Sequence, residues 1–313
     1  MSPRQLVDAI LQRDSVNFAL TNRLPRRLAT RAAGWFSRIE QPLVRDASIA
    51  LWRAFAGGLD LSDARKTRFD SLHDCFIREL RDGARPIDAE AALVSPCDGI
   101  VVGCGRLADT TLVQAKGLTY TLDELLAGAS VTELRDGVYV TLRLTSTMYH
   151  RFHAPDDLVA REVRYVPGDL WNVNPPALAR VPRLYCRNER AVVMTRLATG
   201  EPLAIVAVGA ILVAGIHLHF LADTLDSRVR EGRRHACDAA IRRGDEMGYF
   251  RHGSTIVVCA PKTFAPADGV QVGRTLRMGR PLMRRRAGQR TLTTGAIVGH
   301  RHAGGDDDAV KSV

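Results

Sequence analysis

Three short stretches of the sequence carry side chains that together could perform acyl chemistry. "SPCDGIV" places Asp98 in a Pro/Gly turn directly before a strand-like run. "YHRFHAP" contains His150 and His153, three residues apart, and "HGSTIVV" opens with the pair Gly253-Ser254. A serine hydroxyl becomes a nucleophile when a histidine removes its proton, and a carboxylate orients such a histidine. Asp98, His153 and Ser254 supply that set of groups.

Each stretch also has an ordinary explanation. An aspartate in a Pro/Gly turn commonly caps its own backbone. The two histidines could bind a metal, act as acid and base, or lie on the surface. Gly-Ser pairs occur in many turns. The chain order Asp, His, Ser does not decide the geometry, because triads occur in several orders, and the GxSxG elbow of α/β-hydrolases is absent. At the level of these residues alone, the alternatives stay open.

The overall charge favours an anionic partner. The 313 residues include 44 Lys and Arg against 34 Asp and Glu, a net charge of +10. Aromatic residues make up 6% and no nucleic-acid motif is present, so we expect a membrane surface rather than nucleic acid. The longest apolar stretch, Pro202–Ile216, is interrupted by glycines and shorter than the ~18 residues of a membrane span. It predicts two buried strands, so any membrane contact is expected to be peripheral.

The cysteine pattern indicates reduced thiols. None of the six cysteines forms a CxxC pair, and the first residues do not resemble a secretory signal. We therefore expect free thiols in a protein that faces the cytosol.

The N-terminal segment has the periodicity of helices. In "RLPRRLATRAAGWFSRIEQ", Trp35 and Phe36 belong to an apolar set at helical spacing, whereas Arg27, Arg31 and Arg38 fall elsewhere on the helical wheel. Such a helix could pack on its own core with a solvated basic face. It could equally lie in a membrane interface with its arginines against anionic lipid.

From Phe76 onward, short β-branched runs separated by Gly and Pro predict strands. Further helix is expected only at Leu122–Gly128 and in the region Asp223–Arg243. We predict an α+β protein with N-terminal amphipathic helices followed by a β-rich body that carries the Gly253-Ser254 pair. The predicted divisions are a helical, basic, membrane-associating segment 1–60, a β-rich domain 61–283, and a disordered tail 284–313.

Nine fragments, in this order, resemble those of the phosphatidylserine decarboxylase proenzyme family. They are "FIRELRDGARPI", "SPCDGIV", "QAKGLTYTLDELLAG", "YHRFHAP", "PGDLWNVNP", "NERAVVM", "VAVGAILVAGI", "RRGDEMGYFRHGSTIVV" and "VGRTLRMGRPL". The resemblance spans Phe76 to Leu282, and its specificity comes from the joint order of the fragments. Two positions depart from the usual family pattern: Cys97 stands where a small residue is common, and His252 where many members have Leu.

The resemblance implies a self-cleaving, pyruvoyl-dependent carboxy-lyase. Ser254, activated by Asp98 and His153, would attack the Gly253 carbonyl and become the pyruvoyl cofactor of a C-terminal α chain, 254–313. The β chain would be 1–253. The pyruvoyl group would form a Schiff base with phosphatidylserine and accept electrons as carbon dioxide leaves, giving phosphatidylethanolamine for phospholipid biosynthesis. His150 resembles the family's candidate proton donor in this decarboxylation.

The resemblance also sets the expected partners and location. The substrate would be an anionic phospholipid, met by peripheral association with the cytoplasmic side of the cell membrane, and homodimers are common in the family. We assign neither metal ligands nor nucleic-acid contacts. Two alternatives remain: a zinc-dependent hydrolase using the pairs His150/His153 and His217/His219, or a non-enzymatic basic membrane-binding domain in which "HGST" is an ordinary turn.

Overall fold

The computed structural model describes residues 18, 25–56, 58–211, 215–222, 231–251 and 254–286. Gly253 of the predicted cleavage site and its neighbour His252 lie outside these ranges, as does the part of the predicted tail 284–313 that begins at residue 287. Within the described part, strands outnumber helices, in agreement with the β-rich α+β class predicted from the sequence. The three-part division of the chain stays a prediction.

The helices are short apart from two near the N-terminus. They are α3 (Arg26–Phe36), α4 (Pro42–Ala56), α5 (Leu72–Phe76), α6 (Leu122–Leu126), α7 (Pro175–Leu178) and α8 (Leu184–Arg187), with a 3-10 turn η1 (Thr132–Leu134). The predicted helix at Leu122–Gly128 is confirmed as α6, where Thr121 and Glu124 form a reciprocal capping box.

The strands form the body of the protein. They are β1 (Leu93–Val94), β2 (Gly99–Arg106), β3 (Thr111–Ala115), β4 (Leu118–Thr121), β5 (Val138–Arg143), β6 (Arg151–His153), β7 (Leu158–Val166), β8 (Arg190–Leu197), β9 (Pro202–Gly209), β10 (Ile216–Leu218), β11 (Arg233–Ile241), β12 (Glu246–Phe250), β13 (Ser254–Ala260), β14 (Phe264–Pro266), β15 (Thr275–Leu276) and β16 (Pro281–Arg285). Of the two buried strands predicted in Pro202–Ile216, the first is confirmed as β9, whereas β10 begins only at the last residue of that stretch and 212–214 lie outside the described residues.

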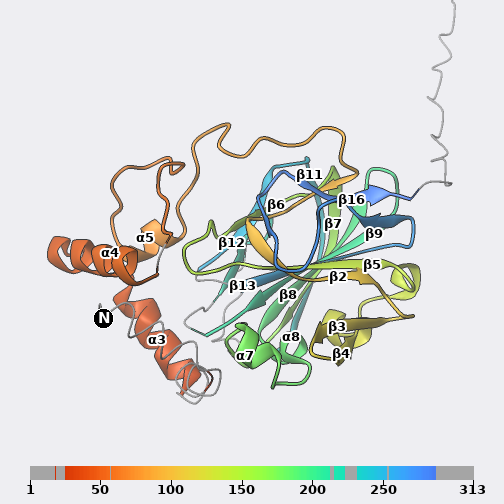
Figure 1. Cartoon of the computed structure of the whole chain (residues 1–313), viewed down its shortest axis with the longest axis horizontal. Coiled ribbons are helices and arrows are strands. Elements are labelled where there is room, and N and C mark those ends of the chain that lie inside the picture. Colours follow the sequence, from red (N-terminus) through yellow and green to blue (C-terminus); the bar gives the residue numbers. More distant parts are fainter. Residues whose placement is uncertain are drawn as a thin grey trace, which may run out of the picture.

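One eight-stranded antiparallel sheet organises the fold, in the order β11-β7-β8-β9-β13-β5-β2-β15. Two three-stranded sheets, β10-β12-β6 and β1-β16-β14, and the hairpin β3-β4 pack around it (Figure 1). The strand that begins at Ser254, β13, lies near the middle of the large sheet, paired with β9 and β5 on either side.

The large sheet buries both faces. Alternate residues of β13 point to opposite sides, so Ile256 and Val258 join one apolar cluster while Val257 and Cys259 join another. The first cluster includes residues of β6 and β12, and the second includes residues of α6, α7 and α8. This double burial explains why β9 and β13 are continuous apolar runs with no polar alternation.

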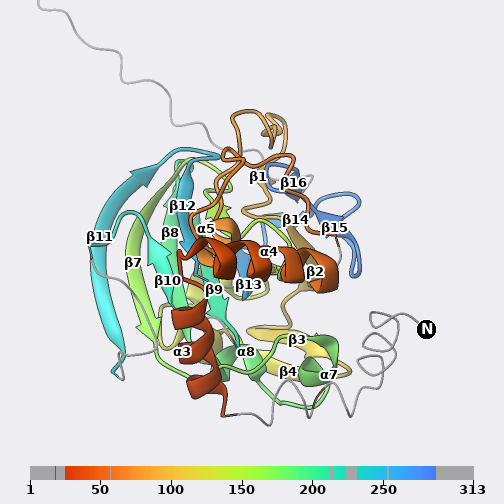
Figure 2. The same cartoon turned by 90° about the vertical axis from the view of Figure 1, so that its left-hand side faces the viewer.

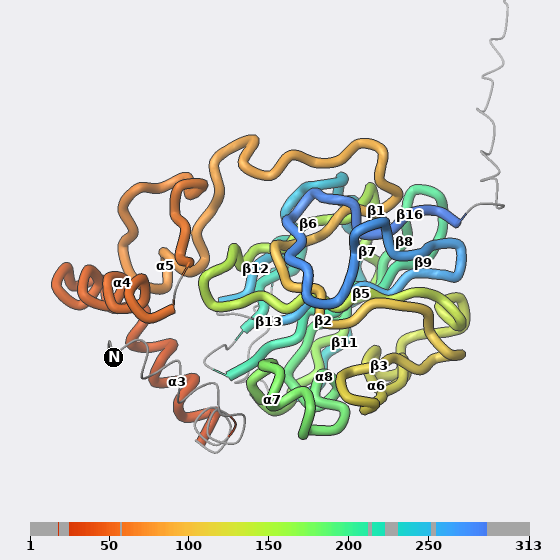
Figure 3. Tube along the Cα trace, viewed as in Figure 1, coloured from red at the N-terminus to blue at the C-terminus, as the bar shows by residue number. Residues whose placement is uncertain are grey.

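The helices α3 and α4 lie to one side of the β body (Figure 1), and Figure 2, which turns this side toward the viewer, shows them in front of the strands. A main-chain hydrogen bond joins the end of α3 to α5, since the N–H of His73 donates to the Ser37 carbonyl. After α5 an extended segment runs over the body to β1, as the tube in Figure 3 shows. Among the described residues, no helix is both long enough and apolar enough to cross a membrane.

One expected helix is wrong. Where described, the second half of Asp223–Arg243 is strand β11, paired with β7 along its length. The alanines of this segment favour a helix, but His235, Cys237, Ala239 and Ile241 alternate with more exposed residues. That period of two matches a strand at the edge of the sheet, and pairing with β7 overrides the local propensity.

All six cysteines are free, as expected.

Candidate active site

Ser254 is the first residue of β13, and its main chain is held on the β9 side. It lies opposite Gly209, the last residue of β9, while Thr255 lies between Val208 on β9 and Arg143 on β5. The strand β13 therefore begins at the edge of the sheet where its neighbours β9 and β5 both end, at Gly209 and Arg143. Chain cleavage directly before Ser254 would leave every pairing of β13 intact.

Asp98 lies in the turn before β2, almost buried, and its carboxylate has two partners. The Arg85 guanidinium donates to it through Nε at 3.0 and 3.1 Å and through Nη2 at 2.7 Å. The main-chain N–H of Met278 donates to Oδ1 at 2.8 Å. Both members of the Arg85–Asp98 ion pair have side chains only 9% exposed, so water screens the pair weakly. Arg85 also reaches Asp63, at 2.9 Å.

His153 ends β6, and its hydrogen bonds define a tautomer. Nδ1 lies 2.9 Å from the Gly244 carbonyl, which can only accept, so Nδ1 carries the hydrogen. Nε2 lies 2.9 Å from the Tyr149 hydroxyl and, in the neutral ring, accepts from it. Burial raises the pKa of Tyr149, which keeps that hydroxyl protonated. Burial also lowers the pKa of His153 below its usual 6.5, which favours a neutral ring whose Nε2 carries no hydrogen.

Asp98 and His153 are brought together through the main chain rather than through a direct side-chain bond. The His153 N–H donates to the Pro96 carbonyl at 2.7 Å, which joins the end of β6 to the turn that holds Asp98. The described contacts of the His153 ring go to Tyr149 and Gly244, and those of the Asp98 carboxylate go to Arg85 and Met278. The Asp98 charge still acts on His153, because it opposes the lowering of the His153 pKa.

His150 is fully buried and directly precedes β6, the strand that ends at His153. Its ring stacks on Phe76 with centroids 3.9 Å apart, and Phe76 in turn stacks on Trp52 of α4 at 5.9 Å. The main-chain carbonyl of His150 accepts from the N–H of Phe250 in β12. His150 is thus held by an aromatic stack that begins at the N-terminal helices, in surroundings different from those of His153.

Asn188 secures the strand end opposite Ser254. It is fully buried, and its Nδ2 donates to the carbonyls of Trp171 and Gly209, both at 2.8 Å. Its Oδ1 accepts from the Trp171 N–H at 2.9 Å. Since Gly209 pairs with Ser254, one amide fastens the "PGDLWNVNP" loop to the end of β9 beside the predicted cleavage position.

The second histidine pair has other contacts. The rings of His217 and His219 lie 5.2 Å apart, and His219 Nε2 lies 2.6 Å from Glu246 Oε1. Glu246 also accepts from Arg151 at 2.8 Å. Within the described ranges, no group of three or more His, Cys, Asp or Glu side chains is arranged to hold a metal ion. The geometry therefore gives no support to the zinc-hydrolase alternative.

Reasoning from the sequence did not single out Arg85, Tyr149 and Gly244, which contact predicted site residues, or Asn188, which binds the Gly209 carbonyl opposite Ser254. All four lie within the quoted fragments, so their position in a family motif was the available signal. Apart from Tyr149, which lies four residues from His153, they act through contacts between distant segments, such as Arg85 with Met278 around one carboxylate. Only the fold brings those segments together.

Comparison with known proteins supports the resemblance. The profile of the phosphatidylserine decarboxylase family matches residues 72–284. A phosphatidylserine decarboxylase proenzyme of Psychrobacter cryohalolentis is 37% identical over 83% of this chain and 95% of its own length. Proenzymes of the same name from Halorhodospira halophila and Yersinia pestis are 38% and 36% identical, over 84% and 86% of this chain and 91% and 96% of theirs. The chain belongs to the phosphatidylserine decarboxylase family.

Proposed function

We propose that this protein decarboxylates phosphatidylserine to phosphatidylethanolamine after cutting its own chain between Gly253 and Ser254. The observation that carries the proposal is family membership over most of the chain, with relatives named as proenzymes. The buried, neutral His153 with an unprotonated Nε2 supports it, because self-cleavage needs a base.

The proposed cleavage begins with attack of the Ser254 hydroxyl oxygen on the Gly253 carbonyl carbon. The hydroxyl proton passes to His153 and then to the departing amide nitrogen, so an ester replaces the peptide bond. Loss of the Ser254 α-proton expels the Gly253 carboxylate and leaves dehydroalanine. Water then replaces the nitrogen, releasing ammonia and leaving a pyruvoyl group at residue 254. The products are a β chain, 1–253, and an α chain, 254–313.

Asp98 and Arg85 would support this base without touching the reacting atoms. When His153 accepts a proton it becomes a cation, and the Asp98 carboxylate stabilises that cation electrostatically. Arg85 and the Met278 N–H hold the carboxylate in place by hydrogen bonds. The Gly244 carbonyl orients the His153 ring, because it accepts the hydrogen bond from Nδ1.

The surroundings of Ser254 fit a pyruvoyl group at this position. The new chain end would start a strand held by β9 and β5, next to Gly209, which has no side chain. Once formed, the group supplies an electron sink for the charge left when carbon dioxide departs. We propose that His150 delivers the proton that completes the reaction, since it is fully buried and held by Phe76.

The N-terminal helices support a peripheral membrane location, and we propose the cytoplasmic side of the membrane. In α3 the fully enclosed residue is Thr30, whereas Trp35 is 71% and Leu28 65% exposed. In α4, Leu43 is 77% exposed. A helix that turns its large apolar side chains away from its own protein needs another apolar partner, and an anionic bilayer suits the net charge of +10. Homodimer formation stays a prediction.

A denaturing gel and a decarboxylation assay test the proposal together. The purified chain should run as two polypeptides, and the mass of the smaller should correspond to residues 254–313 with a blocked N-terminus. Ser254→Ala should remain one full-length polypeptide and release no carbon dioxide from phosphatidylserine. Ser254→Thr keeps a hydroxyl and serves as the matched control, which should cut slowly and give a different blocking group. A wild-type chain that stays intact would contradict the proposal.

A further inference from the structure

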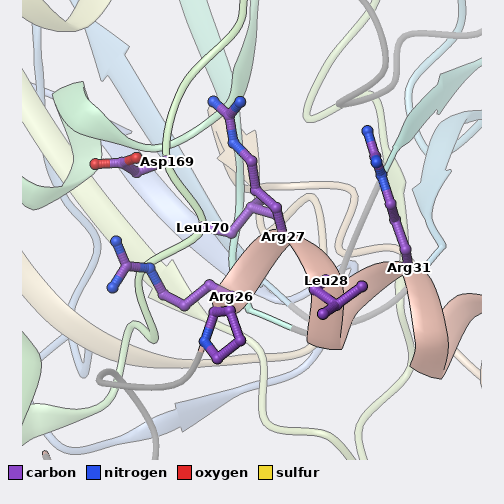
Figure 4. A pocket seen from close by; sticks show the side chains of 7 residues that line it. Arg26, Arg27, Leu28, Arg31, Asp169 and Leu170 are labelled. Atoms are coloured by element: carbon purple, nitrogen blue, oxygen red, sulfur yellow. The ribbon is translucent and has the colours of Figure 1, made fainter.

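A cavity of about 460 Å³ lies between the start of α3 and the "PGDLWNVNP" loop. Its lining residues are Pro25, Arg26, Arg27, Leu28, Arg31, Asp169 and Leu170. Figure 4 shows the Arg27 and Arg31 side chains extending from the same side of α3, with Asp169 and Leu170 across from the helix. The spacing of four residues explains this shared direction. None of the proposed catalytic residues lines the cavity.

The lining has an excess of positive charge. The lining contains three guanidinium groups and one carboxylate, and this carboxylate already has partners outside the lining. Asp169 Oδ2 accepts from the Trp171 indole N–H at 3.1 Å and lies 3.7 Å from Arg187. Guanidinium groups present planar sets of N–H donors that match the oxygens of a phosphate. The cavity is therefore suited to a phosphate-bearing anion.

The walls also carry apolar groups that a free phosphate would not use. Pro25, Leu28 and Leu170 line the cavity, and Leu28 is 65% exposed. Trp35, which is exposed, lies one turn beyond Arg31, at the border between the arginine side of α3 and its apolar side. A phosphate site that runs into an exposed apolar helix face matches the boundary between headgroups and acyl chains in a bilayer.

The cavity also joins two separate segments. Arg27 donates to the Gly168 carbonyl at 3.2 Å, and the Arg26 guanidinium lies 3.8 Å from the centroid of the Trp171 ring. These contacts hold the start of α3 against the loop that Asn188 fastens beside Ser254.

We propose that this cavity is an accessory binding site for the phosphate headgroup of an anionic phospholipid, separate from the site of decarboxylation. The inference rests on the proposed function only in placing α3 at a membrane. The bound lipid would be a membrane component that holds α3 and its loop at the surface.

The test compares two double variants that lose the same charge from the N-terminal region. Arg27→Gln/Arg31→Gln removes two lining guanidinium groups, and Arg53→Gln/Arg68→Gln removes two exposed ones outside the cavity. Binding is measured by vesicle flotation with phosphatidylglycerol in phosphatidylcholine, and by calorimetry with inorganic phosphate alone. Neither probe is a substrate, so the result does not depend on whether the chain decarboxylates phosphatidylserine. Failure of the proposed function would appear separately, as wild-type chain that releases no carbon dioxide.

We expect the cavity variant to bind these vesicles at least about ten-fold more weakly than the control variant, because charge-assisted bonds are lost in addition to diffuse attraction. Arg31→Gln alone, at an exposed position, should show a smaller loss, and normal self-cleavage of each variant reports a folded chain. Equal weakening in the two double variants would overturn the proposal in favour of diffuse attraction. Arginine-dependent binding of inorganic phosphate without any difference on vesicles would assign the cavity to a free anion and would also overturn it.

Discussion

The Arg85 guanidinium holds both carboxylate oxygens of Asp98, with Nη2 2.7 Å from Oδ2 and Nε 3.0 Å from Oδ1. Arg85 lies on the extended segment that crosses from α5 to β1, whereas Asp98 lies in the turn before β2. The pair therefore fixes the position of a nearly buried carboxylate beside the strand end that carries His153. A carboxylate in such surroundings needs a countercharge, since an isolated buried charge is strongly unfavourable.

Removing this countercharge should slow self-cleavage. Arg85→Ala leaves Asp98 buried without its cation, a change that typically costs about 3–5 kcal/mol, and full-length chain should accumulate. Arg85→Lys keeps the charge but not the two-pronged geometry, so it should recover part of the cleavage. The cleaved fraction on a denaturing gel, with the thermal midpoint of each variant, measures the effect.

Arg81→Ala is the matched control, because Arg81 also pairs with Asp63 but is largely exposed. It should cleave normally. If Arg85→Ala cleaves as fast as Arg81→Ala, the Arg85–Asp98 pair has no part in the reaction.

The pH dependence of self-cleavage should report the lowered pKa of His153. A neutral ring is the active form, and burial pushes its protonation below the usual 6.5. The rate should therefore stay level as pH falls to about 6.5 and decline only below it. Stability follows the same sign: the contribution of His153 is present above pH 6.5 and is lost as pH falls through the folded-state pKa. Precursor made by cell-free translation and sampled over time at each pH gives the rate.

Tyr149→Phe should move that decline to higher pH. The Tyr149 hydroxyl donates to Nε2 and so stabilises the neutral ring, and its loss raises the pKa of His153. Tyr139→Phe removes a hydroxyl that donates to the Val113 carbonyl instead, so it should leave the pH profile of cleavage unchanged. An unchanged profile in Tyr149→Phe would show that this bond does not tune the base.

The stack of Phe76 on His150 should matter for decarboxylation and not for cleavage. His150→Ala should be cut normally, yet lose roughly 10²–10⁴-fold in decarboxylation rate if it is the proton donor. Phe76→Leu should also be cut and lose about ten-fold, because the ring that holds His150 at 3.9 Å is gone. Trp52→Leu, one ring further away, should lose less. A His150→Ala chain that fails to cleave would reverse the roles given to the two histidines.

The exposed apolar residues of α3 should dominate membrane binding. Apolar insertion at ~25 cal/mol per Å² depends little on salt, whereas each arginine near an anionic surface is worth about 1 kcal/mol and is screened. Trp35→Ser/Phe36→Ser should therefore release more chain from anionic vesicles than neutralising Arg38. Val113→Ser/Val272→Ser, also exposed but outside the helices, should release none. Equal binding of a folded chain lacking residues 1–56 would contradict this location.

The candidate site residues and most of the strands around them could be predicted from the sequence, because short motifs and strand periodicity are local properties. The motif order indicates Asp98, His150, His153 and Ser254 without any coordinates, and β-branched runs predict the strands that carry them. These patterns are visible in the sequence because a strand buried on one face has alternate apolar residues and a strand buried on both faces has continuous ones. The resemblance also predicted the family that the comparisons confirm.

Only the tertiary structure decided what each group contacts. Asp98 and Arg85 lie 13 residues apart, and Gly244 lies 91 residues from the His153 ring that it orients. The outward direction of Trp35 and Leu28 was open in the helical pattern, since such a helix packs equally well with its apolar side inward. The segment Arg233–Ile241 became a strand because pairing with β7 outweighed its alanine content. Long-range pairing and burial set these outcomes, and local sequence contains neither.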